Sequence, residues 1–122
     1  MREIKFRVYD KNSKIMRDWK WLNERDDLAP YLVEGEDDFY SSAMQYTALK
    51  DKNNKEIYEG DIINICRENT CDIAEVVFDE GCFSVIGYLG DLRTYPIIKY
   101  LFTGYEVEVV GTRYENPELI NS

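Results

Sequence analysis

The stretch DIINICRENTCDIAEVVFDEGCFSVIGY, residues 61–88, decides the fold class of this chain. Apolar and β-branched residues dominate three short runs in it, at 61–66, 73–78 and 82–88, and polar turn residues separate these runs. Short apolar runs with turn residues between them are typical of antiparallel strands. The stretch therefore predicts a meander of three strands.

The residues that follow extend this pattern. Apolar and polar residues alternate over 105–114 (YEVEVVGTRY), which predicts a further strand, and Gly111 interrupts it where we expect a bulge or a close approach of another group. Asn116 offers a capping side chain, Pro117 suits the first helical position and Glu118 suits the first turn. One helical turn is expected after Asn116.

A five-residue motif occurs twice and predicts two similar hairpins. The motif is DKNSK at 10–14 and DKNNK at 51–55, and an apolar pair follows each copy closely. An aspartate that opens a turn can bond the backbone two residues on, and Asn54 tolerates the left-handed conformation. Beyond the second copy, Gly60 supplies the backbone freedom of a turn and Asp61 a local bond to the backbone.

The amino-terminal residues predict a strand with one buried face. Ile4, Phe6 and Val8 alternate with Lys5 and Arg7, which is the period of two that strands show.

Apolar residues between 15 and 22 return after the first motif and are expected to complete a hairpin arm. Residues 22–28 favour a helical turn or two, and residues 34–38 (EGEDD) an acidic loop. We therefore predict an arm with a variable connector over 1–42 and a β-barrel-like body over 43–122.

Composition excludes several classes of protein. With 122 residues, 44% of them hydrophobic and 14% aromatic, the chain has the size and composition of one folded domain despite its net charge of -9. It has no histidine, so catalytic triads and metal sites that need imidazole are excluded. No apolar run reaches the roughly 18 residues that span a bilayer, and the first residues do not resemble a signal peptide, so we expect a soluble protein that is not secreted.

The three cysteines, Cys66, Cys71 and Cys82, are expected to be reduced thiols that pack as small buried hydrophobic side chains. Their spacing matches no standard zinc motif, so no metal and no cofactor is expected. An alternative is that Cys66 and Cys71 face each other across a hairpin, where a bond between them would be strained and reducible.

Charge is unevenly distributed along the chain. Residues 1–25 hold eight Lys or Arg against four Asp or Glu, a net of +4, so the remainder carries -13. Opposite charges on arm and body would suit head-to-tail association between copies, or a partner of each sign. The alternative is two solvated faces.

Four strings of this sequence together resemble the YopX family of small phage and prophage proteins. They are MREIKFRVYDKNSKIM, QYTALKDKNNKEIYEGDIINI, EVVFDEGCFSV and EVVGTRYENPELI. Residues 17–42 and 88–104 carry no such resemblance. Two positions depart from the usual family forms, because Ala48 and Asn54 stand where glycine is common. The resemblance implies a mainly β protein with a small SH3-like barrel and a phage origin, and it transfers no functional residue.

An enzyme is not expected, although carboxylates are plentiful. Two convergent acids can hydrolyse glycosides or hold magnesium. Adjacent acids on a strand or turn point apart, however, and no phosphate-binding loop or metal-spaced motif accompanies them. The carboxylates weighed are Asp37, Asp38, Glu59, Asp61, Asp79 and Glu80.

Binding is the expected class of function. Because tyrosines exceed what a small core buries and aromatic residues are enriched in interfaces, we expect a protein-interaction module that forms homo-oligomers in the host bacterial cytoplasm. The candidate surface is Tyr95, Ile97, Ile98, Tyr100, Leu101 and Phe102. The alternative is single-stranded nucleic-acid binding through a basic aromatic arm, whose composition suits phosphate contacts and base stacking. That arm comprises Lys5, Arg7, Lys11, Lys14, Trp19 and Trp21.

Overall fold

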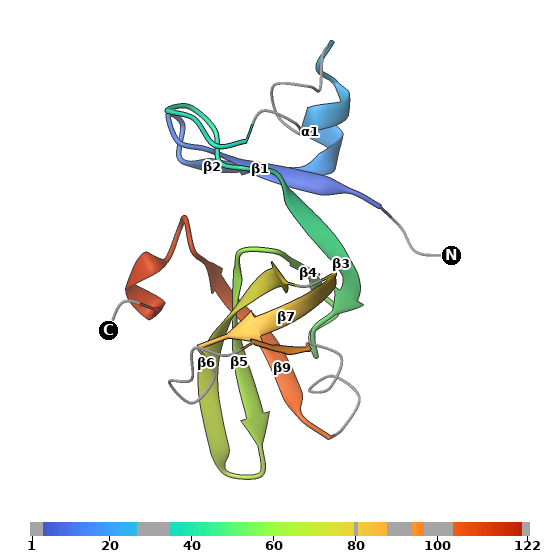
Figure 1. The fold of residues 1–122 in the computed structure, drawn as a ribbon, viewed down its shortest axis with the longest axis vertical. Helices are drawn as coiled ribbons and strands as arrows, with labels where there is room; N and C mark the ends of the chain where they lie inside the picture. The colour runs from blue at the N-terminus through green and yellow to red at the C-terminus, as the bar shows by residue number, and fades with distance from the viewer. Residues whose placement is uncertain (1–3, 27–34, 80, 88–93, 97–103, 121–122) are drawn as a thin grey trace. The chain divides into compact units, whose positions relative to one another are not determined.

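The chain is mainly β, as predicted, and its contacts divide it into two compact units, Met1–Tyr46 and Thr47–Ser122. Figure 1 shows the course of the chain. Among the described residues, no helix is long and apolar enough to cross a membrane. This computed structural model describes residues 4–26, 35–79, 81–87, 94–96 and 104–120.

The first unit contains the predicted hairpin, but its returning strand is shorter than expected. Strand β1 (Phe6–Asp10) pairs with β2 (Ile15–Arg17) and with the start of β3 (Met44–Lys50), both antiparallel. After β2 the chain turns into helix α1 (Trp19–Asn23), so the expectation that residues 19–22 belong to the hairpin was wrong. The cause is Asp18, whose carboxylate accepts a hydrogen bond from the backbone N of Trp21 at 2.9 Å and caps the helix.

The buried face of β1 begins later than the alternation predicts. Val8 is fully buried and Phe6 is half-buried against Trp19, with ring centroids 5.8 Å apart. Ile4, which was expected to share this face, is 63% exposed. It precedes the first residue of β1 and lies outside the buried face of that strand.

The second unit contains the predicted meander, part of an antiparallel sheet in the order β8-β7-β6-β5-β9. The hairpin of β3 and β4 (Glu56–Tyr58), on either side of the second motif, is also confirmed. The strands of the five-stranded sheet are β5 (Asp61–Arg67), β6 (Thr70–Asp79), β7 (Cys82–Ile86), β8 (Thr94–Pro96) and β9 (Glu106–Thr112).

One face of this sheet carries the hydrophobic core. Alternate residues of neighbouring strands supply it, which is the period of two that the sequence shows. Leu49 and Tyr105 pack against its edge. The core residues are Ile57, Ile63, Ile65, Ala74, Val76, Phe83, Val85, Val107 and Val109.

All three cysteines were expected to be buried thiols, and this expectation was wrong. Cys66 and Cys71 form a disulfide between directly opposite positions of β5 and β6, and Cys82 is a free, exposed thiol. Cys71 is exposed and Cys66 is half-buried. The reason is the alternation along each strand, because neighbours such as Ile65 point into the core and the cysteines therefore point to the other face.

Gly111 shows both features that its position predicts. The pairing of β9 with β5 shifts between Ile62 and Ile63, which marks a bulge. A Cβ atom at Gly111 would lie 2.5 Å from Oδ1 of Asn116, so this backbone is closely approached. The same Oδ1 accepts a hydrogen bond from the backbone N of Thr112 at 3.2 Å. Asn116 therefore serves the strand and does not cap the predicted turn, which forms as a 3-10 helix over Pro117–Leu119.

The second motif, DKNNK at 51–55, covers the β9 edge of the sheet. The Oδ1 atom of Asp51 accepts hydrogen bonds from the backbone N of Asn53 and of Lys55, both at 2.9 Å. Its Oδ2 atom accepts from the backbone N of Val109 in β9 at 2.8 Å. The next residue, Lys52, donates its backbone N to the carbonyl of Val107 at 2.9 Å. Backbone groups of the outermost strand are thus paired, which protects a sheet edge.

Replacing Asp51 with asparagine is expected to lower the free energy of unfolding at pH 7 by about 1–3 kcal/mol, because an amide NH₂ would face the N–H of Val109 and leave it unpaired. Burial raises the pKa of Asp51, but hydrogen bonds from Val109, Lys55 and Asn53 outweigh it and hold the pKa below its ordinary value. The charged group therefore stabilises the fold above about pH 4, and this contribution is lost as the pH falls through the lowered pKa.

Urea unfolding at several pH values measures this effect. The difference between wild type and D51N should be largest near neutral pH and shrink below about pH 4. Asp38→Asn is the control, because Asp38 is exposed. It should change the unfolding free energy by less than about 0.5 kcal/mol. An equal effect of both variants would contradict the role given to Asp51.

Replacing Ala48 with glycine is expected to stabilise the protein. Ala48 has a φ of 69°, in the left-handed region that costs an L-residue about 1–2 kcal/mol. Glycine removes this cost but loses more chain entropy on folding, so the expected gain is about 0.5–1 kcal/mol. Ala74→Gly, at a buried strand position, should instead destabilise. Thermal unfolding of both variants tests the prediction, and a lower melting temperature for A48G would refute it.

Candidate functional site

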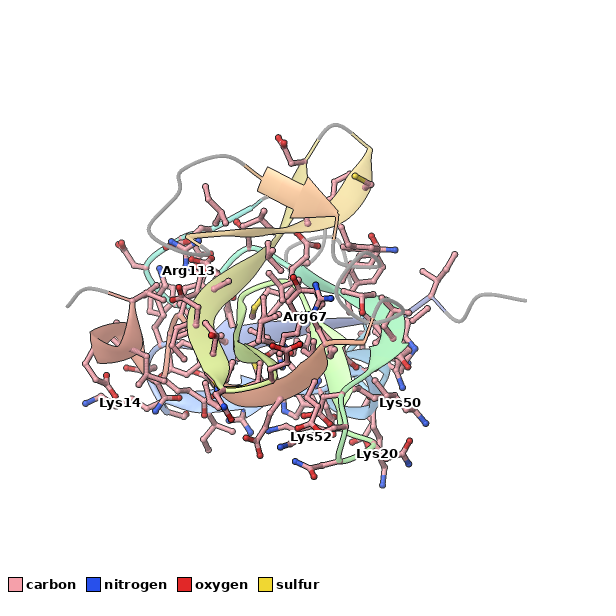
Figure 2. All side chains as sticks on the ribbon, turned by 90° about the horizontal axis from the view of Figure 1, so that it is seen from below. Lys14, Lys20, Lys50, Lys52, Arg67 and Arg113 are labelled. Carbon is pink, nitrogen blue, oxygen red and sulfur yellow. A yellow bond between two sulfur atoms is a disulfide. The ribbon has the colours of Figure 1, made fainter. Side chains whose placement is uncertain are left out.

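The basic aromatic arm predicted from the sequence lies within the first unit. Lys5 precedes β1, Arg7 lies in β1, and the turn after β1 carries Lys11 and Lys14. The two tryptophans, Trp19 and Trp21, lie on α1. The side chains of Lys14 and Lys20 extend away from the ribbon (Figure 2). The other arm residues make contacts within the unit.

Arginine side chains stack on the ring of Trp21. The guanidinium carbon of Arg17 lies 5.0 Å from the ring centroid and that of Arg25 lies 4.3 Å from it. Tyr40 lies at 6.1 Å, centroid to centroid. Arg17 also donates to Oδ2 of Asp10 from Nε at 3.2 Å and from Nη2 at 3.1 Å. Since cation–π contacts already use this ring, a nucleotide base would have to displace them to stack there.

Further aromatic and basic residues of the arm are also engaged. Trp19 packs against Phe6, and the Lys5 ammonium lies 4.8 Å from the ring centroid of Tyr46. Both contacts help to build the first unit. The mixture of basic and aromatic residues that favoured nucleic acid therefore has a structural explanation.

The acidic loop neutralises part of the basic arm. The ammonium group of Lys11 lies 2.8 Å from Oε2 of Glu36 and donates to the carbonyl of Asp37 at 2.7 Å. Residues 26–38 hold six acids and no Lys or Arg, so residues 1–46 contain eight basic and ten acidic residues, a net of -2. Counting the charge of residues 1–25 apart from the rest of the chain concealed this balance, because the basic arm and the acidic loop belong to one unit.

The same acidic loop presents an exposed aromatic side chain that sequence reasoning missed. Phe39 is 60% exposed. Its backbone N donates to Oδ1 of Asp37 at 2.8 Å, and its carbonyl accepts from the backbone N of Lys11 at 2.8 Å. The Oδ1 atom of Asp37 also accepts from the backbone N of Tyr40 at 2.7 Å. The signal in the sequence is an aspartate two residues before a phenylalanine, which favours a turn with an aromatic tip.

These hydrogen bonds also set the charge of the turn. The backbone N–H groups of Tyr40 and Phe39 hold the pKa of Asp37 below its ordinary value. Asp37 is therefore charged at neutral pH, and its carboxylate accepts the two backbone hydrogen bonds of the turn.

The second predicted surface is largely outside the described residues. Tyr95 lies in β8, where it pairs with Val85 of β7. Ile97, Ile98, Tyr100, Leu101 and Phe102 lie outside the described residues. The tyrosines whose side chains are described are buried or half-buried, and Tyr46 and Tyr58 are less than one tenth exposed.

The carboxylates weighed as catalytic candidates have structural partners or are dispersed. Asp61 is 1% exposed, and its Oδ2 accepts a hydrogen bond from the backbone N of Tyr58 at 2.7 Å, the local bond that the sequence predicts. Asp37 holds the turn described above, and Glu80 lies outside the described residues. Within the described part of the chain, no three His, Cys, Asp or Glu residues are grouped as a metal would need.

Comparisons of this chain with known proteins find one matching family model and similar solved structures. The family model described as "YopX protein" matches residues 5–121. A search of curated proteins finds no match. The crystal structure of protein EF1440 from Enterococcus faecalis is 24% identical, covers 99% of this chain and 100% of its own, and has a TM-score of 0.62. That of protein yopX from Bacillus subtilis is 22% identical, covers 96% of this chain and 98% of its own, and has a TM-score of 0.56. At these identities the two structures share the fold.

The occupied arm leads to a prediction about nucleic acid. We expect no micromolar binding of single-stranded DNA or RNA in a gel shift at about 0.15 M salt, because the first unit is net acidic and its tryptophans are engaged. Micromolar binding that weakens steeply with salt would contradict this. If that binding were lost on neutralising Lys5, Arg7, Lys11 and Lys14, it would be assigned to the predicted basic arm.

Proposed function

This chain belongs to the YopX family, and on that premise we propose that it is a non-enzymatic protein-interaction module of a phage or prophage. It acts in the cytoplasm of the host bacterium. In this proposal the second unit is a small SH3-like barrel that serves as a scaffold, and the first unit carries the surface that a partner protein contacts.

The exposed ring of Phe39 carries the proposal. Aromatic side chains that enter a pocket on a partner supply much of the energy of protein interfaces. Flexible side chains and loops lose entropy on binding, so an anchor held in place beforehand binds more tightly. Phe39 meets this condition, because its backbone N donates to the carboxylate of Asp37 and its carbonyl accepts from the backbone N of Lys11.

Charge supports a protein partner over nucleic acid. The turn that presents Phe39 contains Glu36, Asp37 and Asp38, and the ammonium of Lys11 offsets only one of these charges. A phosphate backbone would be repelled by this turn. A protein surface with an apolar pocket and a basic rim would be attracted by it.

Association between copies is part of the proposal. Interfaces between identical subunits bury apolar side chains against each other. The described surface offers Phe39 in the first unit and Phe78, 51% exposed, in the second. We therefore expect a second copy of the chain among its partners.

The test is affinity purification of a tagged chain from bacteria that carry the phage, with a second copy under a different tag and with nuclease treatment. Phe39→Asp should lose the bound protein, since it puts a charge where an apolar anchor is needed. Ile15→Asp is the matched control, because Ile15 is an exposed apolar residue of the same unit outside the turn. It should retain the partner.

The outcomes separate the alternatives. A partner that survives nuclease, is lost with F39D and is kept with I15D supports the proposal. Recovery of the second tag identifies association between copies. Material that disappears after nuclease treatment would contradict a protein-interaction function and favour nucleic acid.

A further inference from the structure

The disulfide lies on an exposed hairpin tip. Cys66 and Cys71 are directly opposite in the pairing of β5 and β6, with Cα atoms 4.1 Å apart, close to the short spacing of a non-hydrogen-bonded pair. Only the pair Arg67–Thr70 and the two turn residues lie beyond them. Cys71 is exposed, so a reductant in solution can reach its sulfur.

The fold does not need this bond for its core. Chains below about 40 residues usually need disulfides or metals, whereas one of this length buries enough apolar surface to fold without them. The core of the second unit contains no cysteine, and the nearest core residue on β5 is Ile65 on the opposite face. Because the bond lies outside the core, the core can stay packed when the bond is broken.

The third cysteine is too distant to exchange with the pair. Cys82 pairs with Asp79 at the other end of β6. Asp79 lies eight positions along β6 from Cys71, which corresponds to roughly 26 Å at 3.3 Å per residue. A reductant must therefore come from another molecule.

We propose that Cys66 and Cys71 form a reversible thiol–disulfide site whose reactant is a dithiol. A thiolate of the reductant attacks Sγ of the exposed Cys71, the bond between the two cysteines breaks, and Cys66 leaves as a thiolate that takes up a proton. The second thiolate of the reductant then attacks the reductant sulfur that is bonded to Cys71. Cys71 leaves as a thiolate and takes up a proton. Two electrons pass to the protein, and the reductant becomes a disulfide.

The bond controls the order of the hairpin tip. Reduction removes the crosslink next to the closing pair Arg67–Thr70, where Glu68 has a φ of 57° and so holds an unfavourable backbone. Arg67 lies over the ring of Tyr105, at 5.3 Å from the centroid, and Cys66 pairs with Glu106. Opening the tip therefore loosens the start of β9 as well, while the core residues Ile63 and Ile65 of β5 keep their packing.

Thiol titration and hydrogen exchange of the folded, full-length chain test this proposal, with dithiothreitol as the dithiol. Titration should find one thiol per chain in the oxidised protein and three after treatment without denaturant. Exchange of the amides at 67–70 and 105–106 should become at least about threefold faster on reduction, and that of Ile63 and Ile65 should not change.

Two variants complete the experiment. Cys82→Ser, the matched control, should show no thiol when oxidised, two when reduced and the same change in exchange. The double variant Cys66→Ser, Cys71→Ser should exchange like reduced wild type and not respond to dithiothreitol. Three thiols in protein oxidised by air, a bond that resists dithiothreitol until the chain unfolds, or equal exchange in both states would each overturn the proposal.

Discussion

One buried carboxylate, that of Asp51, joins the parts of the second unit. It accepts hydrogen bonds from the backbone of its own turn and from Val109 of β9, 58 residues away. Through these bonds the β3–β4 hairpin covers the outer edge of the sheet and closes it over the core. An edge strand with unpaired backbone groups invites association with other chains. A charge that satisfies backbone donors on both sides costs little to bury, because its own hydrogen bonds replace those with water.

The first copy of the motif uses its aspartate in another way. Asp10 accepts from the backbone of Asn12 and Ser13 in its own turn, but its second oxygen bonds Arg17, which also lies over Trp21. The left-handed residue of this turn is Lys14, with a φ of 56°, whereas the second turn uses Asn54, with a φ of 66°. Nearly identical pentapeptides thus form different turns. In each turn the Oδ1 atom of the aspartate accepts from the backbone of its own loop. The Oδ2 atom accepts from a donor outside the loop, which is Arg17 for Asp10 and Val109 for Asp51.

Opposite charges within the first unit neutralise each other in part, and this supports the functional proposal. The sequence shows a basic arm and an acidic connector, and each alone would suggest a partner of opposite charge. In the folded unit Lys11 lies between them, bonded to Glu36 and to the backbone of Asp37. This arrangement uses up charge that would attract nucleic acid and at the same time holds the turn that presents Phe39. Lys11 of the predicted arm therefore supports the turn that we propose as a surface for a partner protein.

The sequence by itself determined the features that depend on neighbouring residues: the meander, both motif hairpins, the bulge at Gly111 and the left-handed Asn54. Period-two alternation and turn chemistry act within a few residues, so one sequence suffices to predict them. Tertiary structure alone decided the exposure of Ile4 and the donor that each motif aspartate bonds beyond its own turn. It also decided between free thiols and a bond for Cys66 and Cys71, since the sequence allows both. These depend on which strand lies beside which and on which face is covered. The contact between Asp51 and Val109 joins residues 58 positions apart, and a single sequence carries no local signal for such a contact.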